Sequence, residues 1–169
     1  NSELESELFK IEQYVDMVMG FLRTDSMSSD IMIRQYELKD IIKQVLRKYA
    51  KEFIRRKISL DFSEPDCRIL TDEKWLVFVL EQIVSNALKY TKEGRISIYL
   101  EKNEYNWLVI EDTGIGIQKE DLPRVFERGF TGFNGRTDKR STGIGLYLVK
   151  RTLKMLGHTV EIQSEVGKG

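Results

Sequence analysis

The 169-residue chain has 41% hydrophobic and 10% aromatic residues, enough apolar surface for one packed α/β domain with an appendage. Its 27 basic and 27 acidic residues cancel, and no basic tract carries interleaved aromatics, so nucleic-acid binding is not expected. One cysteine and one histidine exclude an internal disulfide and a zinc site of Cys and His ligands. No run of about 18 apolar residues is present, so this fragment is not expected to enter a membrane.

Residues 1–23 are predicted to form a helix with an apolar seam, which Tyr14, Met19 and Phe21 widen. The apolar residues follow one another at alternating spacings of four and three, as in a coiled coil or a helical bundle. The seam consists of Leu4, Leu8, Ile11, Val15, Val18 and Leu22. An ordinary amphipathic helix that lies on the following domain is the alternative. Residues 24–31 are rich in turn formers and are expected to be a linker.

Residues 32–169 are expected to form the main domain, with elements that alternate between strand and helix patterns. Short strands are expected at 32–36, 58–62 and 68–70, and helices at 38–53 and 72–90, the second capped by Thr71 or Asp72. The break at Glu64-Pro65-Asp66 favours a hairpin of the strands at 58–62 and 68–70.

The second half of the domain begins with two strands, at 96–100 and 107–112, joined by a turn at 103–106. A helical turn at 120–126 and a long, basic, glycine-rich loop follow. A helix from Ile144 to Leu156 then ends at Gly157, and residues 159–164 are expected to be a last strand.

Three polar features stand out against this pattern. Asp112 ends an apolar strand and is followed by Gly114 and Gly116, which allow a sharp turn and close approach of a ligand. Asn86 lies on the half-buried edge of a helix, where its amide oxygen suits Mg²⁺, although bonding to neighbouring backbone is the simpler explanation. Gly143 and Gly145 open a helix whose free N–H groups attract phosphate. Each feature alone is weak evidence.

Together with the segment from Val125 to Arg128, these three features resemble, in chain order, the four motifs of sensor histidine kinases. Ser85 to Thr91 is similar to the N box, Asp112 to Gly116 to the G1 box, Val125 to Arg128 to the F box, and Gly143 to Leu146 to the G2 box. The segments 126–132 and 141–148 are also similar to Gram-positive intramembrane-sensing kinases of the antimicrobial-peptide and bacitracin response type. The resemblance covers about half of the chain.

The resemblance implies the fold and the domain organisation. A two-layer α/β (α+β) sandwich of a mixed sheet and three main helices, the Bergerat-type ATP-binding fold of the GHKL superfamily, would occupy residues 32–169, with an ATP lid at about 126–142. Residues 1–23 would be the second helix of a dimerisation hairpin. The phosphoacceptor histidine would lie outside this fragment, which is therefore not expected to phosphorylate itself, and His158 is expected to be structural.

The resemblance also assigns roles to single residues. Asp112 would bind the adenine amino group, Asn86 would hold Mg²⁺, and Lys89, Arg128 and Arg136 would act on the phosphates of ATP. The remaining nucleotide contacts would come from Tyr90, Gly114, Gly116, Ile117, Thr142, Gly143, Gly145 and Leu146. Ile110 and Leu148 would add apolar walls.

Partners and location follow from the same resemblance. The expected partners are the histidine-bearing helix, a response regulator and a second copy of the full-length protein, and the fragment would be a cytoplasmic domain of a bacterial cell-membrane protein. A GHKL-type ATPase, a serine protein kinase and a scaffold without nucleotide binding are the alternatives. Gln82 stands where hydrolysing relatives have a glutamate base, and it cannot act as a base, which argues against efficient hydrolysis.

Overall fold

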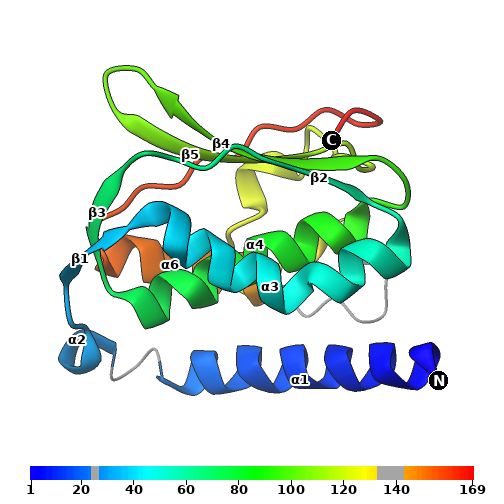
Figure 1. Cartoon of the computed structure of the whole chain (residues 1–169), viewed down its shortest axis with the longest axis horizontal. Helices are drawn as coiled ribbons and strands as arrows, with labels where there is room; N and C mark the ends of the chain where they lie inside the picture. The colour runs from blue at the N-terminus through cyan, green and yellow to red at the C-terminus, as the bar shows by residue number, and fades with distance from the viewer. Residues whose placement is uncertain (24–26, 133–142) are drawn as a thin grey trace.

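A mixed sheet lies over a layer of three helices, and a further helix runs beneath that layer (Figure 1). The computed structural model describes residues 1–23, 27–132 and 143–169. The helical layer consists of α3 (Leu38–Arg56), α4 (Glu73–Tyr90) and α6 (Gly145–Met155). This architecture confirms the predicted two-layer α/β sandwich of a mixed sheet and three main helices.

The helix α4 is central because it packs against both α3 and α6. Asp72 caps it by accepting a hydrogen bond from Trp75 N at 3.1 Å, so the cap is Asp72 rather than Thr71. Its buried face includes Leu76, Val79 and Val84, which join one core with α3, α6 and the sheet. One edge of α4 is left facing the end of the sheet.

The main sheet has the order β2-β4-β5, from β2 (Ser59–Phe62), β4 (Arg95–Lys102) and β5 (Asn106–Asp112). The strands β4 and β5 form the predicted hairpin, with Ile98 opposite Ile110 and Ile96 opposite Asp112. Because Ile96 and Ile98 are fully buried, this register fixes where β5 ends. It places the Asp112 carboxylate at the sheet's end, beside α4.

The predicted hairpin of residues 58–62 and 68–70 is wrong. The strand β2 pairs in parallel with β4, whereas β3 (Arg68–Thr71) pairs with β1 (Arg34–Glu37) in a separate two-stranded sheet. The segment around Pro65 carries the chain from one sheet to the other instead of turning it back. Strand alternation identified both segments but did not determine their partners.

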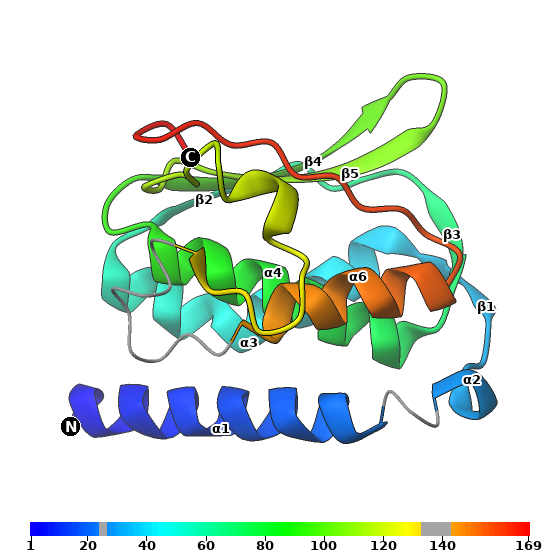
Figure 2. The same cartoon turned by 180° about the vertical axis from the view of Figure 1, so that it is seen from behind.

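The strand predicted at residues 159–164 is also wrong. This segment is extended, and its odd residues are exposed while Val160, Ile162 and Ser164 are half-buried, but it forms no ladder within the described chain. It runs behind β5 in Figure 1 and in front of it when seen from the other side in Figure 2. Side chains hold it in place, because Val160 packs on the core and Ser164 bonds to Ile117.

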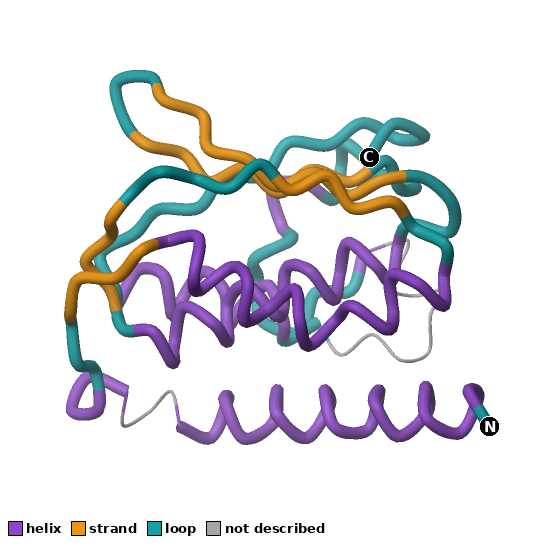
Figure 3. Tube along the Cα trace, in the orientation of Figure 1, coloured by secondary structure: helices purple, strands orange, loops and turns teal. Residues whose placement is uncertain are grey.

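The N-terminal helix α1 (Ser2–Arg23) lies along the helical layer and precedes the short α2 (Met27–Asp30), as the tube in Figure 3 shows. It turns a face other than its seam toward the domain. Met17 and Gly20 are buried there, whereas most seam residues are more than half exposed. The exposed seam residues are Leu4, Leu8, Ile11, Val15 and Leu22. The position of α1 thus agrees with the alternative of a helix that lies on the following domain. The face that α1 turns toward the domain is not the apolar seam.

Among the described residues, no helix is both long and apolar enough to cross a membrane.

Candidate nucleotide-binding site

An open cleft of about 1540 Å³ lies where the end of β5 faces α4, and α1 borders it on the opposite side. It is large enough for a nucleotide, since ligand pockets usually measure about 300–1,000 Å³. The predicted residues that line it are Asn86, Lys89, Tyr90, Ile110, Asp112, Gly116, Ile117, Gly143, Gly145 and Leu146. Residues predicted from three separate motifs are therefore brought together.

The loop after β5 is folded tightly around Asp112. The N–H of Gly114 donates to Asp112 Oδ1 at 2.9 Å, and the N–H of Ile115 donates to Tyr90 O at 3.1 Å. The second bond ties this loop to the end of α4. One carboxylate oxygen is thereby fixed by the backbone, which leaves the other free to accept a hydrogen bond from a ligand.

Gly114 and Gly116 of this loop lie so close to other backbone atoms that a Cβ would not fit. A Cβ on Gly116, whose φ is 73°, would lie 2.2 Å from Glu165 O. A Cβ on Gly114 would lie 2.5 Å from Tyr90 O. Only glycine therefore allows the loop to approach both α4 and the C-terminal segment.

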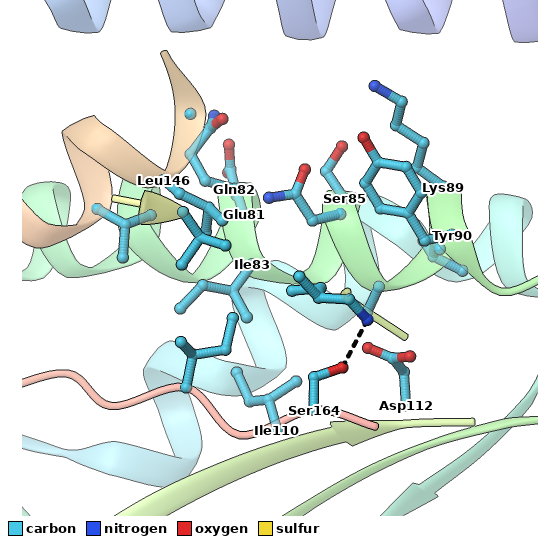
Figure 4. Close-up of a pocket in the computed structure, with 18 of the residues that line it drawn as sticks. Glu81, Gln82, Ile83, Ser85, Lys89, Tyr90, Ile110, Asp112, Leu146 and Ser164 are labelled. Carbon is cyan, nitrogen blue, oxygen red and sulfur yellow. Dashed lines mark hydrogen bonds between the residues drawn. The ribbon is translucent and has the colours of Figure 1, made fainter. Parts of the chain in front are cut away.

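The edge of α4 supplies the opposite wall, as Figure 4 shows. Gln82, Lys89 and Tyr90 project from it on the side of α1, while Asp112 points up from the sheet. The Lys89 ammonium lies 5.1 Å from the centroid of the Tyr90 ring. A cation and an aromatic ring thus stand together near a carboxylate, a set of groups suited to a phosphorylated base.

Glu81 lines the cleft, but its carboxylate is already engaged by a neighbouring cation. Its carboxylate binds Lys48 of α3 at 3.0 Å, and Lys48 also binds Asp16 of α1 at 3.1 Å. Burial opposes the charge on Lys48, but the hydrogen bonds to both carboxylates raise its pKa. This ion-pair network commits Glu81 to joining three helices, which argues against a role as a general base.

The second glycine pair closes the cleft on the side of α6. A Cβ on Gly143 would lie 2.5 Å from Gly129 C, and Gly129 N–H donates to Gly143 O at 2.9 Å. A Cβ on Gly145 would lie 3.3 Å from Gln82 Oε1. The start of α6 therefore meets both the segment at Gly129 and the edge of α4.

Three predicted residues, Gly114, Arg128 and Leu148, do not line the cleft. Arg128 is exposed and lies over the ring of Phe21 in α1, with 4.9 Å to the ring centroid. Leu148 is fully buried in α6 and forms no part of the wall. The predictions for Arg136 and Thr142 fall outside the described residues.

A metal ion would need more than protein ligands here. No group of three or more His, Cys, Asp or Glu residues suited to a metal occurs within residues 1–23, 27–132 and 143–169. Asn86 lines the cleft with an amide oxygen, and Mg²⁺ commonly takes one or two protein oxygens, with water and phosphate as its other ligands. The residues present fit such a shared site.

Ser164 was missed by motif reasoning. Its hydroxyl accepts from Ile117 N at 2.8 Å and donates to Gly169 O at 2.8 Å, so it pins the loop after Asp112 to the C-terminal turn (Figure 4). A serine in an extended polar segment carries no signal of its own. Only the alternation of the segment, which places Ser164 on its inward face, could have indicated it.

Comparison with known proteins identifies the family of the chain that forms this cleft. Residues 71–169 match the family of histidine kinase-, DNA gyrase B- and HSP90-like ATPases. The chain belongs to this ATPase family. The predicted nucleotide-binding domain is thereby confirmed, and the match includes α4, the loop after β5 and α6.

The curated relatives with similar sequences are sensor histidine kinases. The chain is 34% identical over 171 residues to the sensor histidine kinase YxdK of Bacillus subtilis, covering 99% of this chain and 53% of that protein. It is 36% identical over 166 residues to the sensor protein kinase GraS of Staphylococcus aureus, covering 96% of this chain and 48% of that protein. The predicted resemblance to this group of sensor histidine kinases is confirmed. The chain spans about half the length of these relatives.

Solved structures agree on the fold of the ATPase domain and its preceding helix. The histidine kinase AdeS of Acinetobacter baumannii superposes with a TM-score of 0.68 at 25% identity, covering 98% of this chain and 79% of that one. Full-length ShkA in complex with AMPPNP gives a TM-score of 0.77 at 22% identity, covering 99% of this chain and 35% of that one. The second likeness concerns the fold alone.

Proposed function

We propose that this chain is the ATP-binding catalytic domain of a two-component sensor histidine kinase. It binds Mg-ATP and transfers the γ-phosphoryl group to a histidine in another part of a longer protein. In this transfer the bond from the γ-phosphorus to the bridging oxygen of ADP breaks, and a phosphorus–nitrogen bond to the histidine forms. A response regulator then receives the phosphoryl group. The full-length protein is a homodimer in the bacterial cell membrane, with this domain in the cytoplasm.

The placement of Asp112 carries the proposal. Its carboxylate stands at the end of β5, with Oδ1 held by Gly114 N–H, and it faces the edge of α4 that bears Asn86 and Lys89. We assign the free oxygen to the amino group of adenine. The cleft thus has a carboxylate for the base at one end and amide and ammonium groups along α4 for the phosphates. This arrangement is complementary to a nucleotide.

The phosphate end requires positioning and charge neutralisation more than covalent chemistry. We assign Asn86 to Mg²⁺, Lys89 to phosphate oxygens and Tyr90 to packing against the nucleotide. Mg²⁺, when bound, would spread the negative charge that develops on the phosphoryl oxygens. Gly143 and Gly145 leave the backbone at the start of α6 open to phosphate. Arg128 and Arg136 remain the candidates for a cation contributed by the lid.

The only histidine is a poor acceptor. His158 Nε2 is bonded to Thr71 Oγ1 at 3.1 Å, and burial lowers the pKa of its imidazole. Thr71 precedes the start of α4, at the opposite end of that helix from Asn86. We therefore place the acceptor histidine outside these 169 residues, in a protein about twice as long as this chain, like its relatives.

The exposed seam of α1 supports a role for residues 1–23 in a dimerisation hairpin. A helix docked on its own domain would bury its apolar stripe, yet α1 buries Met17 and Gly20 and leaves Leu8 and Ile11 more than half exposed. A seam of this spacing pairs with other helices. We assign it to a bundle with the histidine-bearing helix and a second copy of the protein.

Titration calorimetry with Mg²⁺ and a non-hydrolysable ATP analogue tests the nucleotide site. Wild-type protein should bind, Asp112→Asn should weaken binding by about tenfold or more, and Asp61→Asn, an exposed position on β2, should match the wild type. Absence of binding to the wild-type chain would contradict the proposal and support the scaffold alternative.

The type of phosphotransfer is tested by adding a separate helical hairpin that carries a histidine. Acid-labile phosphohistidine on the hairpin supports the kinase assignment. Acid-stable phosphoserine on a partner protein, or rapid ATP hydrolysis without transfer, would instead support a serine kinase or a hydrolysing ATPase. Gln82 in the cleft wall argues against hydrolysis, because an amide cannot take a proton from water.

A further inference from the structure

Thr91 is a fully buried residue directly behind the proposed adenine site. It follows α4 as its C-cap, its exposed fraction is 0%, and its Oγ1 has no hydrogen-bond partner in the described part of the chain. Buried polar groups are nearly always bonded, so a lone hydroxyl in such a place requires an explanation. An alanine or valine would pack there without leaving a polar group unsatisfied.

The surroundings of Thr91 point toward Asp112. Thr91 Oγ1 lies 2.9 Å, and Asp112 Oδ1 2.8 Å, from the position that a Cβ on Gly114 would occupy. Both oxygens therefore border the same glycine. Asp112 Oδ1 already accepts from Gly114 N–H, but a carboxylate oxygen accepts more than one hydrogen bond, and a hydroxyl proton rotates freely.

We propose that Thr91 is a positioning residue for base recognition: its hydroxyl donates to Asp112 Oδ1 when nucleotide is bound and fixes the carboxylate for the adenine amino group. The residue does not line the cleft, so it acts through Asp112 rather than on the nucleotide. This inference rests on the proposed function, because it presupposes that Asp112 binds the base.

Removing the Thr91 hydroxyl should therefore affect the stability of the protein and its affinity for ATP in opposite directions. In the free protein the hydroxyl is buried and bonds to none of the described residues, so the isosteric change Thr91→Val should leave the unfolding temperature equal or higher. The same change should weaken ATP binding about five- to tenfold, the value of one hydrogen bond. If Thr91 served only packing, its replacement would lower the unfolding temperature before it affected ATP binding.

Thr152 provides a matched control. It is also 0% exposed, and its Oγ1 has no hydrogen-bond partner within residues 1–23, 27–132 and 143–169, but it lies in α6 and does not line the cleft. Thr152→Val should therefore change stability in the same direction as Thr91→Val and leave ATP affinity as in the wild type. Thr91→Ser keeps the hydroxyl and should restore most of the affinity.

Calorimetry and thermal unfolding of the wild type and the three variants, with ATP and with purine riboside triphosphate, test the inference. The analogue lacks the 6-amino group, so the loss caused by Thr91→Val should shrink to less than about twofold. A Thr91→Val protein that binds ATP like the wild type would overturn the inference, as would equal losses for both nucleotides accompanied by a lower unfolding temperature. If the wild type itself does not bind ATP, the proposed function fails as well.

Discussion

The guanidinium of Arg128 lies over the aromatic ring of Phe21, 4.9 Å from its centroid, and so joins the loop region between β5 and α6 to the N-terminal helix. Arg128 is exposed and makes this contact from the segment that follows the 3-10 turn Leu122–Arg124. The residue that motif reasoning assigned to phosphate is thus engaged by α1. Docking of α1 and the position of this arginine are linked.

Replacing Phe21 by leucine should loosen α1. A cation–π contact at an exposed site contributes about 0.5–1 kcal/mol, so amide hydrogen exchange in the last turns of α1 should accelerate about two- to fivefold. Phe21→Tyr keeps a ring and should exchange like the wild type. Unchanged exchange in Phe21→Leu would show that the contact adds nothing to docking.

Replacing Lys48 by methionine should destabilise the protein by about 1–3 kcal/mol in chemical denaturation. Lys48 joins Asp16 and Glu81, and the Glu81 side chain is only 16% exposed, so the loss leaves a half-buried carboxylate without its cation. Lys51→Met, at an exposed position of the same helix, should change the free energy of unfolding by less than about 0.5 kcal/mol. Equal effects of the two variants would contradict this role for the ion-pair network.

Stability should fall as the pH is lowered from 7.5 toward 5.5, and His158 should contribute to the slope. Burial lowers its pKa below the ordinary 6.5, so the unfolded chain binds a proton at a pH where the folded chain does not. The contribution is fully present above about pH 6.5 and is lost as the pH falls through the folded pKa. Chemical denaturation at both pH values should show that the free energy of unfolding of His158→Gln depends less on pH than that of the wild type. An equal pH dependence of the two proteins would refute the contribution of His158.

Replacing Asn86 by alanine should remove the magnesium dependence of nucleotide binding. If Asn86 holds Mg²⁺, the affinity of the variant for ATP in excess magnesium should fall by about tenfold or more. Its affinity in excess chelator should equal that of the wild type, which serves as the internal control. A similar loss under both conditions would indicate a direct contact with the nucleotide or a packing role.

Replacing Gly116 by alanine should cost about 2–4 kcal/mol of stability and abolish nucleotide binding. The new Cβ would have to displace Glu165 O, 2.2 Å away, in addition to adopting a positive φ of 73°. Gly157→Ala has a similar φ of 78°, but its Cβ would have no atom of the described residues within 4 Å, so it should cost only about 1 kcal/mol and leave binding intact. Comparable losses in both variants would mean that backbone strain alone explains the effect.

Much of the domain follows from its residue pattern. The apolar face and Asp72 cap of α4, the hairpin of β4 and β5, and the end of α6 before Gly157 are local features that periodicity and capping determine. Asp112, Gly116, Gly143 and Gly145, which belong to two short motifs, line one cleft. Local preference and tertiary structure agree in these places.

The wrong or missing parts depend on long-range contacts. The residue patterns of β2 and β3 do not indicate that these strands belong to different sheets. Residues 159–164 show strand alternation, yet they pair with no strand among the residues that the structure describes. The docking face of α1 escaped prediction because it uses Gly20 against Phe78 and Gln13 against Tyr49, contacts that a hydrophobic pattern does not reveal. Ser164 and Thr91 matter through their neighbours in space.

The bond from Ile117 N to Ser164 also bears on how such domains are shortened for study. A truncation after residue 163 would retain every motif by which the site was recognised, from Asn86 to Leu146. It would nevertheless remove the hydroxyl and the following turn against which the Asp112 loop rests. A fragment chosen by motif content alone should therefore fold and yet bind nucleotide poorly, so inactivity in such a fragment would reflect its boundary rather than its chemistry.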